Sequence, residues 1–136
     1  MEFLDKLKMD TYSVGMRKNE AYLERYRDIY GAVEFLEKLP RMYKHIEFDN
    51  GINLSIQAST NHYCTPRITL DDLKGYDTME IALIGSDFIS ADELELTDSL
   101  KESLNEYYDN TVYGYVPVEL IDKLYTELKL VYGLKE

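Results

Sequence analysis

The sequence predicts a single α+β domain over residues 1–136, in which helices pack on one face of a small antiparallel sheet of about four strands. Three observations favour this class. The chain has 136 residues, 45% of them apolar and 30% charged, which suits one domain with a substantial core. Alternating apolar runs on both sides of an Asp-Asn-Gly turn predict a hairpin over residues 44–56. Two longer stretches, 20–39 and 117–132, have helical periodicity.

The amino-terminal part is expected to be helical. Residues 2–8 suit a short helix, and residues 1–18 are interpreted as a peripheral N-terminal extension of the domain. A longer helix is predicted over residues 20–39, because the Asn19 side chain can cap its first turn and Pro40 ends it. Its apolar stripe recurs at steps of four and three and consists of Tyr22, Tyr26, Ile29, Val33 and Leu36.

The hairpin over residues 44–56 has two conceivable loops. A two-residue loop at 50–51 would mix apolar and polar side chains on one face. A three-residue loop at 49–51 keeps the faces distinct and places Gly51 in the left-handed conformation, so we expect this loop. It pairs Phe48 with Ile52, Ile46 with Leu54, and Glu47 with Asn53.

Two more strands and two more helices complete the predicted fold. Residues 78–84 and 111–116 are rich in β-forming side chains. The acidic stretch between them suits a short helix over residues 98–107. Pro117 opens the last helix and Gly133 ends it. One face of this helix carries Val118, Ile121, Leu124, Tyr125, Leu128 and Val131.

The charge of the chain is unevenly distributed. There are 26 acidic and 15 basic residues, which give a net charge of −11. Residues 71–109 hold twelve of the acids and only two bases, Lys74 and Lys101, whereas both flanks are nearly neutral. This argues against direct binding of nucleic acid, whose phosphates are bound by clustered Lys and Arg. The acidic stretch suits a basic protein partner; the simpler alternative is that it serves solubility.

Tyrosines are interleaved with these acids. The chain has 13 tyrosines and no tryptophan, and tyrosine is enriched at protein interfaces because its ring is apolar and its hydroxyl polar. Six tyrosines lie in or beside the acidic half: Tyr63, Tyr76, Tyr107, Tyr108, Tyr113 and Tyr115. We therefore predict a partner-binding face. Its candidate residues are Asp87, Asp92, Glu93, Glu95, Asp98, Glu102, Glu106, Tyr107, Tyr108 and Asp109.

No sequence motif marks a catalytic or metal site. His62 and Cys64 would point to the same side of an extended segment, yet no orienting residue accompanies them. The single cysteine suits a small buried thiol in a reducing compartment. His45, His62 and Cys64 lack the paired spacing of zinc ligands. We therefore expect a non-enzymatic protein without catalytic residues, bound metal or cofactor.

Two strings stand out in the chain: His-Tyr-Cys-Thr-Pro-Arg at 62–67 and Thr-Val-Tyr-Gly-Tyr-Val-Pro-Val-Glu at 111–119. They resemble a family of small hypothetical proteins of bacteriophages and prophages, over roughly residues 33–132, with the acidic segment 89–105 departing from it. The family has no assigned reaction, so the resemblance implies a phage setting and no functional residues. By analogy, small acidic phage proteins often inhibit host defence by occupying nucleic-acid grooves.

The leading hypothesis is a non-enzymatic phage accessory protein of the anti-CRISPR or anti-restriction type. It would inhibit a basic, nucleic-acid-handling host protein, such as a CRISPR effector or restriction enzyme, by acting as a nucleic acid mimic. The alternative is a structural or assembly protein that forms a homodimer through the 20–39 helix. No apolar run approaches 18 residues and the first eight residues are unlike a signal peptide, so we expect a location in the host cytoplasm and no membrane contact.

Overall fold

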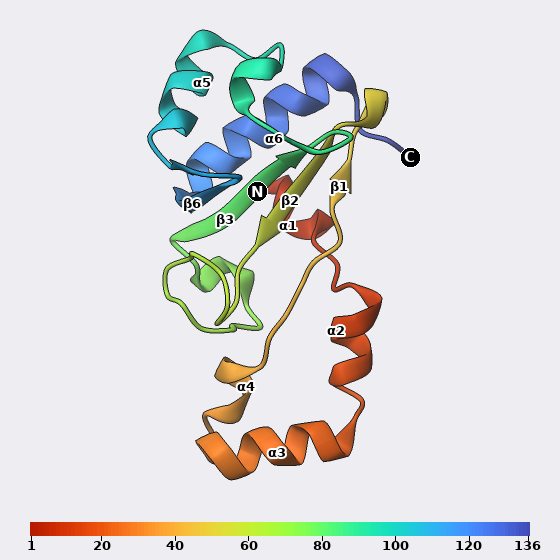
Figure 1. The fold of residues 1–136 in the computed structure, drawn as a ribbon, viewed down its shortest axis with the longest axis vertical. Helices are drawn as coiled ribbons and strands as arrows, with labels where there is room; N and C mark the ends of the chain where they lie inside the picture. Colours follow the sequence, from red (N-terminus) through yellow and green to blue (C-terminus); the bar gives the residue numbers. More distant parts are fainter.

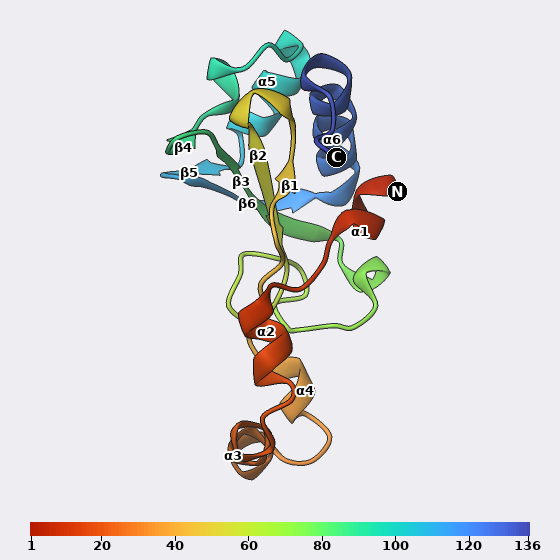
Figure 2. The ribbon, with the colours of Figure 1, turned by 90° about the vertical axis from the view of Figure 1, so that its right-hand side faces the viewer.

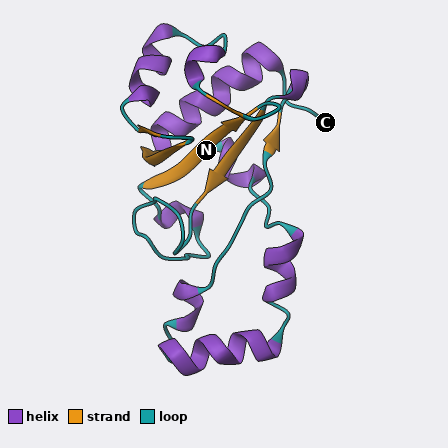
Figure 3. Cartoon of the chain, in the orientation of Figure 1, coloured by secondary structure: helices purple, strands orange, loops and turns teal.

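The computed structural model describes residues 1–136 and has the predicted α+β architecture, with antiparallel strand pairs throughout (Figures 1 and 3). The six helices are α1 (Glu2–Lys6), α2 (Thr11–Met16), α3 (Glu20–Tyr30), α4 (Phe35–Lys38), α5 (Asp98–Asn105) and α6 (Val118–Tyr132). The strands are β1 (Ile46–Glu47), β2 (Asn53–Gln57), β3 (Thr78–Ile84), β4 (Phe88–Ile89), β5 (Tyr108–Asp109) and β6 (Val112–Pro117). Single turns of 3-10 helix are η1 (Asp49–Gly51), η2 (Leu73–Gly75) and η3 (Ala91–Glu93). No helix combines the length and apolar character that a membrane span needs.

The sheet has six strands, two more than the sequence predicts. Its order is β1-β2-β3-β6-β5, and β4 pairs with the end of β3. The strand expected over residues 78–84 coincides with β3, and the one expected over 111–116 corresponds to β6. The additional strands, β4 and β5, have two residues each, too few for an alternating pattern to show in the sequence.

The hairpin formed by β1 and β2 has the predicted register. Its pairs are Ile46 with Leu54 and Glu47 with Asn53. Residues 49–51 form the turn, in which Asn50 (φ +65°) and Gly51 (φ +72°) both adopt the left-handed conformation. Phe48 is 1% exposed, and a slip of one residue would turn its ring toward solvent, which is why the register is strongly determined.

The main hydrophobic core lies between the sheet and α6, which crosses one face of the sheet (Figure 2). The fully buried side chains that meet there include Met79, Ile81 and Leu83 of β3 and Ile121, Leu124 and Leu128 of α6. The helix predicted over 117–132 therefore packs on the sheet as expected. It begins one residue late, because Pro117 still belongs to β6.

The first residues belong to this core, so the expectation of a peripheral extension over residues 1–18 is wrong for α1. Phe3 is 0% exposed, and its ring packs 6.4 Å from that of Tyr125, measured between centroids. The Tyr125 hydroxyl donates a hydrogen bond to the Glu2 carboxylate at 2.6 Å, and Lys129 forms an ion pair with the same carboxylate at 2.8 Å. The charged and apolar alternation in this segment gave no sign of these long-range contacts.

The helix predicted over residues 20–39 is broken and does not pack on the sheet. Asn19 caps α3 as expected, accepting a hydrogen bond from the Tyr22 amide at 3.2 Å. However, α3 ends at Tyr30, because Gly31 adopts a φ of +91° that few other residues tolerate, and α4 follows after a turn. Together with α2, these helices project away from the sheet (Figures 1 and 2). We call residues 11–38 the arm.

The arm has a small interior of its own. The Tyr22 and Tyr26 rings lie 5.0 Å apart, and the Arg27 guanidinium lies 4.8 Å from the centroid of the buried Phe35 ring. No residue of α3 is fully buried. The apolar stripe predicted for this helix is therefore divided: Tyr22 and Tyr26 pack against each other inside the arm, whereas Val33 is 86% exposed.

Candidate protein-binding surface

The acidic segment 86–110 is held in place by buried side chains. Its four leucines, Leu94, Leu96, Leu100 and Leu104, are all buried and belong to the main core. The amide of Ala91 donates to the Tyr113 hydroxyl at 2.8 Å. The amide and hydroxyl of Thr97 both donate to the Glu127 carboxylate of α6 at 2.8 Å. These contacts anchor the polypeptide, so the acids between the leucines are presented from a defined backbone.

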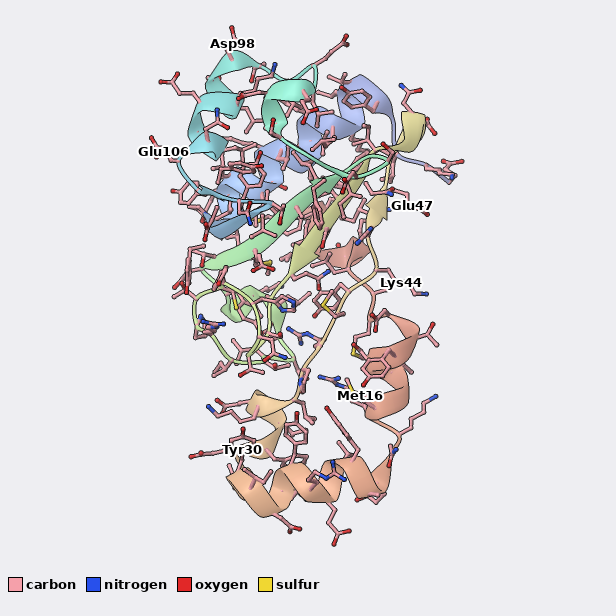
Figure 4. All side chains as sticks on the ribbon, in the orientation of Figure 1. Met16, Tyr30, Lys44, Glu47, Asp98 and Glu106 are labelled. Carbon is pink, nitrogen blue, oxygen red and sulfur yellow. The ribbon has the colours of Figure 1, made fainter.

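The predicted acids lie on the outside of this segment. All eight are exposed: Asp87, Asp92, Glu93, Glu95, Asp98, Glu102, Glu106 and Asp109. We call these residues the acidic cap. Figure 4 shows Asp98 and Glu106 projecting outward from the two ends of α5. The one base within the segment, Lys101, forms no ion pair, and its Nζ lies 3.5 Å from the Asp92 carbonyl. The cap therefore carries a local charge that its own residues do not neutralise.

Two acids of the cap have structural partners. The Glu93 carboxylate accepts a hydrogen bond from the Ser90 amide at 2.7 Å in a capping box at η3. The Asp92 carboxylate accepts from the Asn105 side chain at 3.2 Å, which ties η3 to α5. The remaining six carboxylates form no ion pair, and Asp87 caps only the neighbouring Phe88 amide. Charge reversal is best confined to acids without such partners.

Three of the other four acids of the 71–109 stretch lie apart from this surface: Asp71, Asp72 and Asp77 precede β3, whereas the cap follows it. The fourth, Glu80, is half-buried in β3, and its carboxylate accepts a hydrogen bond from the Tyr63 amide at 3.3 Å. A strand of this length separates its two ends by roughly 20 Å, at about 3.3 Å per residue. The continuous acidic stretch of the sequence is therefore divided in space.

A hollow of about 540 Å³ adjoins the acidic cap. We call it the tyrosine hollow. Its lining consists of Tyr63, Glu106, Tyr107, Tyr108, Asp109, Gly114 and Tyr115. Tyr107 and Tyr108 are candidate site residues from the sequence, and both line this hollow together with Glu106 and Asp109. Tyr63 and Tyr115, which the sequence places beside the acidic half, are not among the candidate site residues, because their proximity depends on how the 62–67 loop folds over β6.

A β-bulge shapes the hollow. In β6, Gly114 and Tyr115 together oppose the single residue Glu80 of β3, since Met79 pairs with Val116 while Ile81 pairs with Tyr113. Tyr115 has a φ of +55°, a strained value for a residue with a Cβ, and its amide donates to the Tyr63 carbonyl at 2.9 Å. A Cβ on Gly114 would lie 3.1 Å from the Tyr63 Cβ, so a larger residue here would require Tyr63 to move by a few tenths of an ångström.

The chemistry of the hollow favours a cation. The Tyr63 and Tyr115 rings lie 5.7 Å apart, and the Arg67 guanidinium lies 5.1 Å from the Tyr63 centroid, which shows that this ring already accepts a cation on one side. The carboxylates of Glu106 and Asp109 add negative charge at the edge. Aromatic faces combined with carboxylates suit a guanidinium or ammonium group.

His62 and Cys64 have separate environments. His62 Nδ1 lies 2.6 Å from Ser59 Oγ, and Nε2 lies 3.2 Å from Met42 Sδ. The Cys64 thiol donates to the carbonyls of Ser59 and Pro66, both at 3.3 Å. Burial raises the pKa of the Cys64 thiol and lowers the pKa of His62 to about 4. These surroundings favour a neutral thiol and a neutral imidazole. No three His, Cys, Asp or Glu side chains are grouped as metal ligands.

Comparison of the chain with protein-family models, with curated proteins and with solved structures finds no match.

Proposed function

We propose that this chain is a non-enzymatic inhibitor of the anti-defence type, which binds a basic, nucleic-acid-handling protein through the acidic cap and the tyrosine hollow. A phage origin and a host cytoplasmic location would follow from the sequence resemblance. In this proposal the partner is a protein whose Arg- and Lys-rich groove normally holds nucleic acid, such as a CRISPR effector or restriction enzyme.

The observation that carries this proposal is the tyrosine hollow at the edge of the cap. Exposed acids alone would serve solubility equally well. A hollow with four tyrosine side chains and two carboxylates offers a specific place for one Arg or Lys side chain of the partner. The acids around it would supply long-range attraction and orientation, which raise the association rate more than the final affinity.

The test is capture of host proteins with the full chain as bait, followed by competition with duplex DNA or RNA. The cap variant reverses four exposed acids that have no side-chain partner: Glu95→Lys, Glu102→Lys, Glu106→Lys and Asp109→Lys. The control variant makes the same change in net charge elsewhere on the surface: Asp5→Lys, Glu24→Lys, Glu47→Lys and Glu136→Lys. Proteins captured by wild type and control should be lost with the cap variant, and nucleic acid should displace them.

Equal losses in the cap and control variants would show that only the net charge matters, and the proposed surface would then be wrong. Indifference of the captured proteins to nucleic acid would exclude the mimicry. A third variant, Tyr115→Ala, isolates the hollow because it leaves every acid in place. It should weaken capture about 10-fold or more, as loss of a central aromatic residue does at many interfaces.

A second candidate function is self-association through the arm, in line with the homodimer considered from the sequence. The observation that favours it is the exposure of Ile29 (65%), Val33 (86%) and Leu36 (52%). Light scattering would decide: a dimer that becomes a monomer in Ile29→Asp and Val33→Asp would support it, whereas a monomeric wild-type protein at high concentration would exclude it.

A further inference from the structure

A second hollow lies at the neck of the molecule, where the arm meets the body, and its charge is opposite to that of the acidic cap. Its volume is about 400 Å³. Its charged lining residues are Lys8, Arg17, Arg41 and Asp71, so positive charges outnumber negative ones by three to one. We call it the neck pocket. In a chain with a net charge of −11, this local excess is unusual, and the proposed function makes no use of it.

Arg41 is the buried member of this set and is only 4% exposed. Its Nη1 donates to the Leu70 carbonyl at 2.5 Å, and its Nη2 donates to the Ala58 carbonyl at 2.6 Å and the Tyr76 hydroxyl at 3.1 Å. Its Nε is buried and has no hydrogen-bond partner. No carboxylate forms an ion pair with it. Its charge is met by neutral dipoles and by the Tyr43 ring, whose centroid lies 4.8 Å from the guanidinium carbon, while Asp71 lines the same pocket without forming an ion pair with it.

Arg17 reaches the same pocket from the end of α2. Its Nη1 donates to the Pro40 carbonyl at 3.0 Å and to the Ser13 carbonyl at 3.4 Å, and the rest of its guanidinium forms no hydrogen bond. Burial and the positive charge of Arg41 both lower the pKa of Arg17, and the Asp71 carboxylate offsets this only in part, which indicates two like charges in a partly desolvated place. Such an arrangement is unfavourable on its own and becomes favourable when an anion is bound beside it.

We propose that the neck pocket binds a small oxyanion of the phosphate type. Arg17 and the exposed Lys8 would donate hydrogen bonds to it, and Arg41 would contribute its buried charge. The forked donors of arginine match the geometry of phosphate oxygens. The pocket exceeds the size of inorganic phosphate, and its remaining lining includes Leu7 and Tyr43, so it has room for an organic group attached to the phosphate.

The binding test uses the full chain and two probes, inorganic phosphate and adenosine monophosphate, each compared with sodium chloride at equal ionic strength. Amide NMR shifts should change in a saturable way at residues 7–9, 41–43 and 71–73. Lys8→Gln should weaken binding and Asp71→Asn should strengthen it, each about 3- to 10-fold, since each removes one charge near the anion. Lys135→Gln, a surface lysine outside the pocket, should leave the affinity unchanged.

Asp71→Asn is the most informative variant, because a purely structural role of the pocket would not make the protein bind an anion more tightly. Tighter binding of adenosine monophosphate than of inorganic phosphate would assign the source to a phosphorylated organic molecule, and equal binding would assign it to the phosphate group alone. The proposal is overturned if neither probe causes a saturable change beyond that of chloride, or if Lys8→Gln and Asp71→Asn bind as wild type does. None of these tests changes an acid of the cap variant. The outcome of the tests is therefore independent of the proposed function.

Discussion

His62 provides a residue-scale prediction because its pKa is lowered to about 4, first by burial and then by the positive charges of Arg41 and Arg67. Above pH 6.5 the imidazole is neutral in both the folded and the unfolded chain, so its contribution to stability is complete. Below pH 6.5 the unfolded chain binds a proton that the folded chain does not. As the pH is lowered from 6.5 toward the folded pKa of His62, the free energy of unfolding should therefore decrease, by up to about 1.4 kcal/mol per pH unit.

Denaturant unfolding between pH 8 and pH 4 measures this slope. Carboxylates also titrate near the lower limit, so the difference between wild type and His62→Gln isolates the histidine. The variant should have a flatter profile between about pH 6.5 and pH 4.5. His45→Gln serves as the control, because His45 is exposed. Parallel profiles for wild type and His62→Gln would contradict the prediction.

At the scale of elements, α1 is predicted to be indispensable although it has only five residues. Phe3→Ala should lower the free energy of unfolding by roughly 3–5 kcal/mol, because a fully buried ring is replaced by a cavity. Tyr12→Ala is the matched control in α2: its ring is 72% exposed, and its loss should change stability by less than about 0.5 kcal/mol. If both substitutions change the free energy of unfolding by the same small amount, measured by denaturant unfolding, the N-terminal segment is peripheral and the prediction is wrong.

At the scale of the whole molecule, charge is separated along the long axis. Segment 86–110 contains eight acids and one base, whereas the arm contains five of each. Figure 1 places α5 and α3 at opposite ends. Association through the cap should weaken steeply as ionic strength rises from about 50 mM to about 300 mM, because exposed charges are screened over the Debye length. Association through the apolar residues of the arm should be nearly insensitive to salt.

Surface plasmon resonance of a captured partner and light scattering of the chain alone, both over this salt range, separate the two modes. Electrostatic capture is ruled out if partner binding does not change with ionic strength and the cap variant binds the partner as wild type does.

The sequence by itself determined the elements whose signal is local. These are the register of the 44–56 hairpin, the limits of β3, the N-terminal capping of α3 by Asn19 and the buried face of α6. Turn chemistry and side-chain periodicity act between residues that are close along the chain, so they can be interpreted without the fold. The tertiary structure alone decided that Phe3 is buried against Tyr125 and that Tyr63 meets Tyr115 across the bulge of β6. Each of these depends on packing between segments distant in sequence, where one residue's environment is set by a partner that no local pattern identifies.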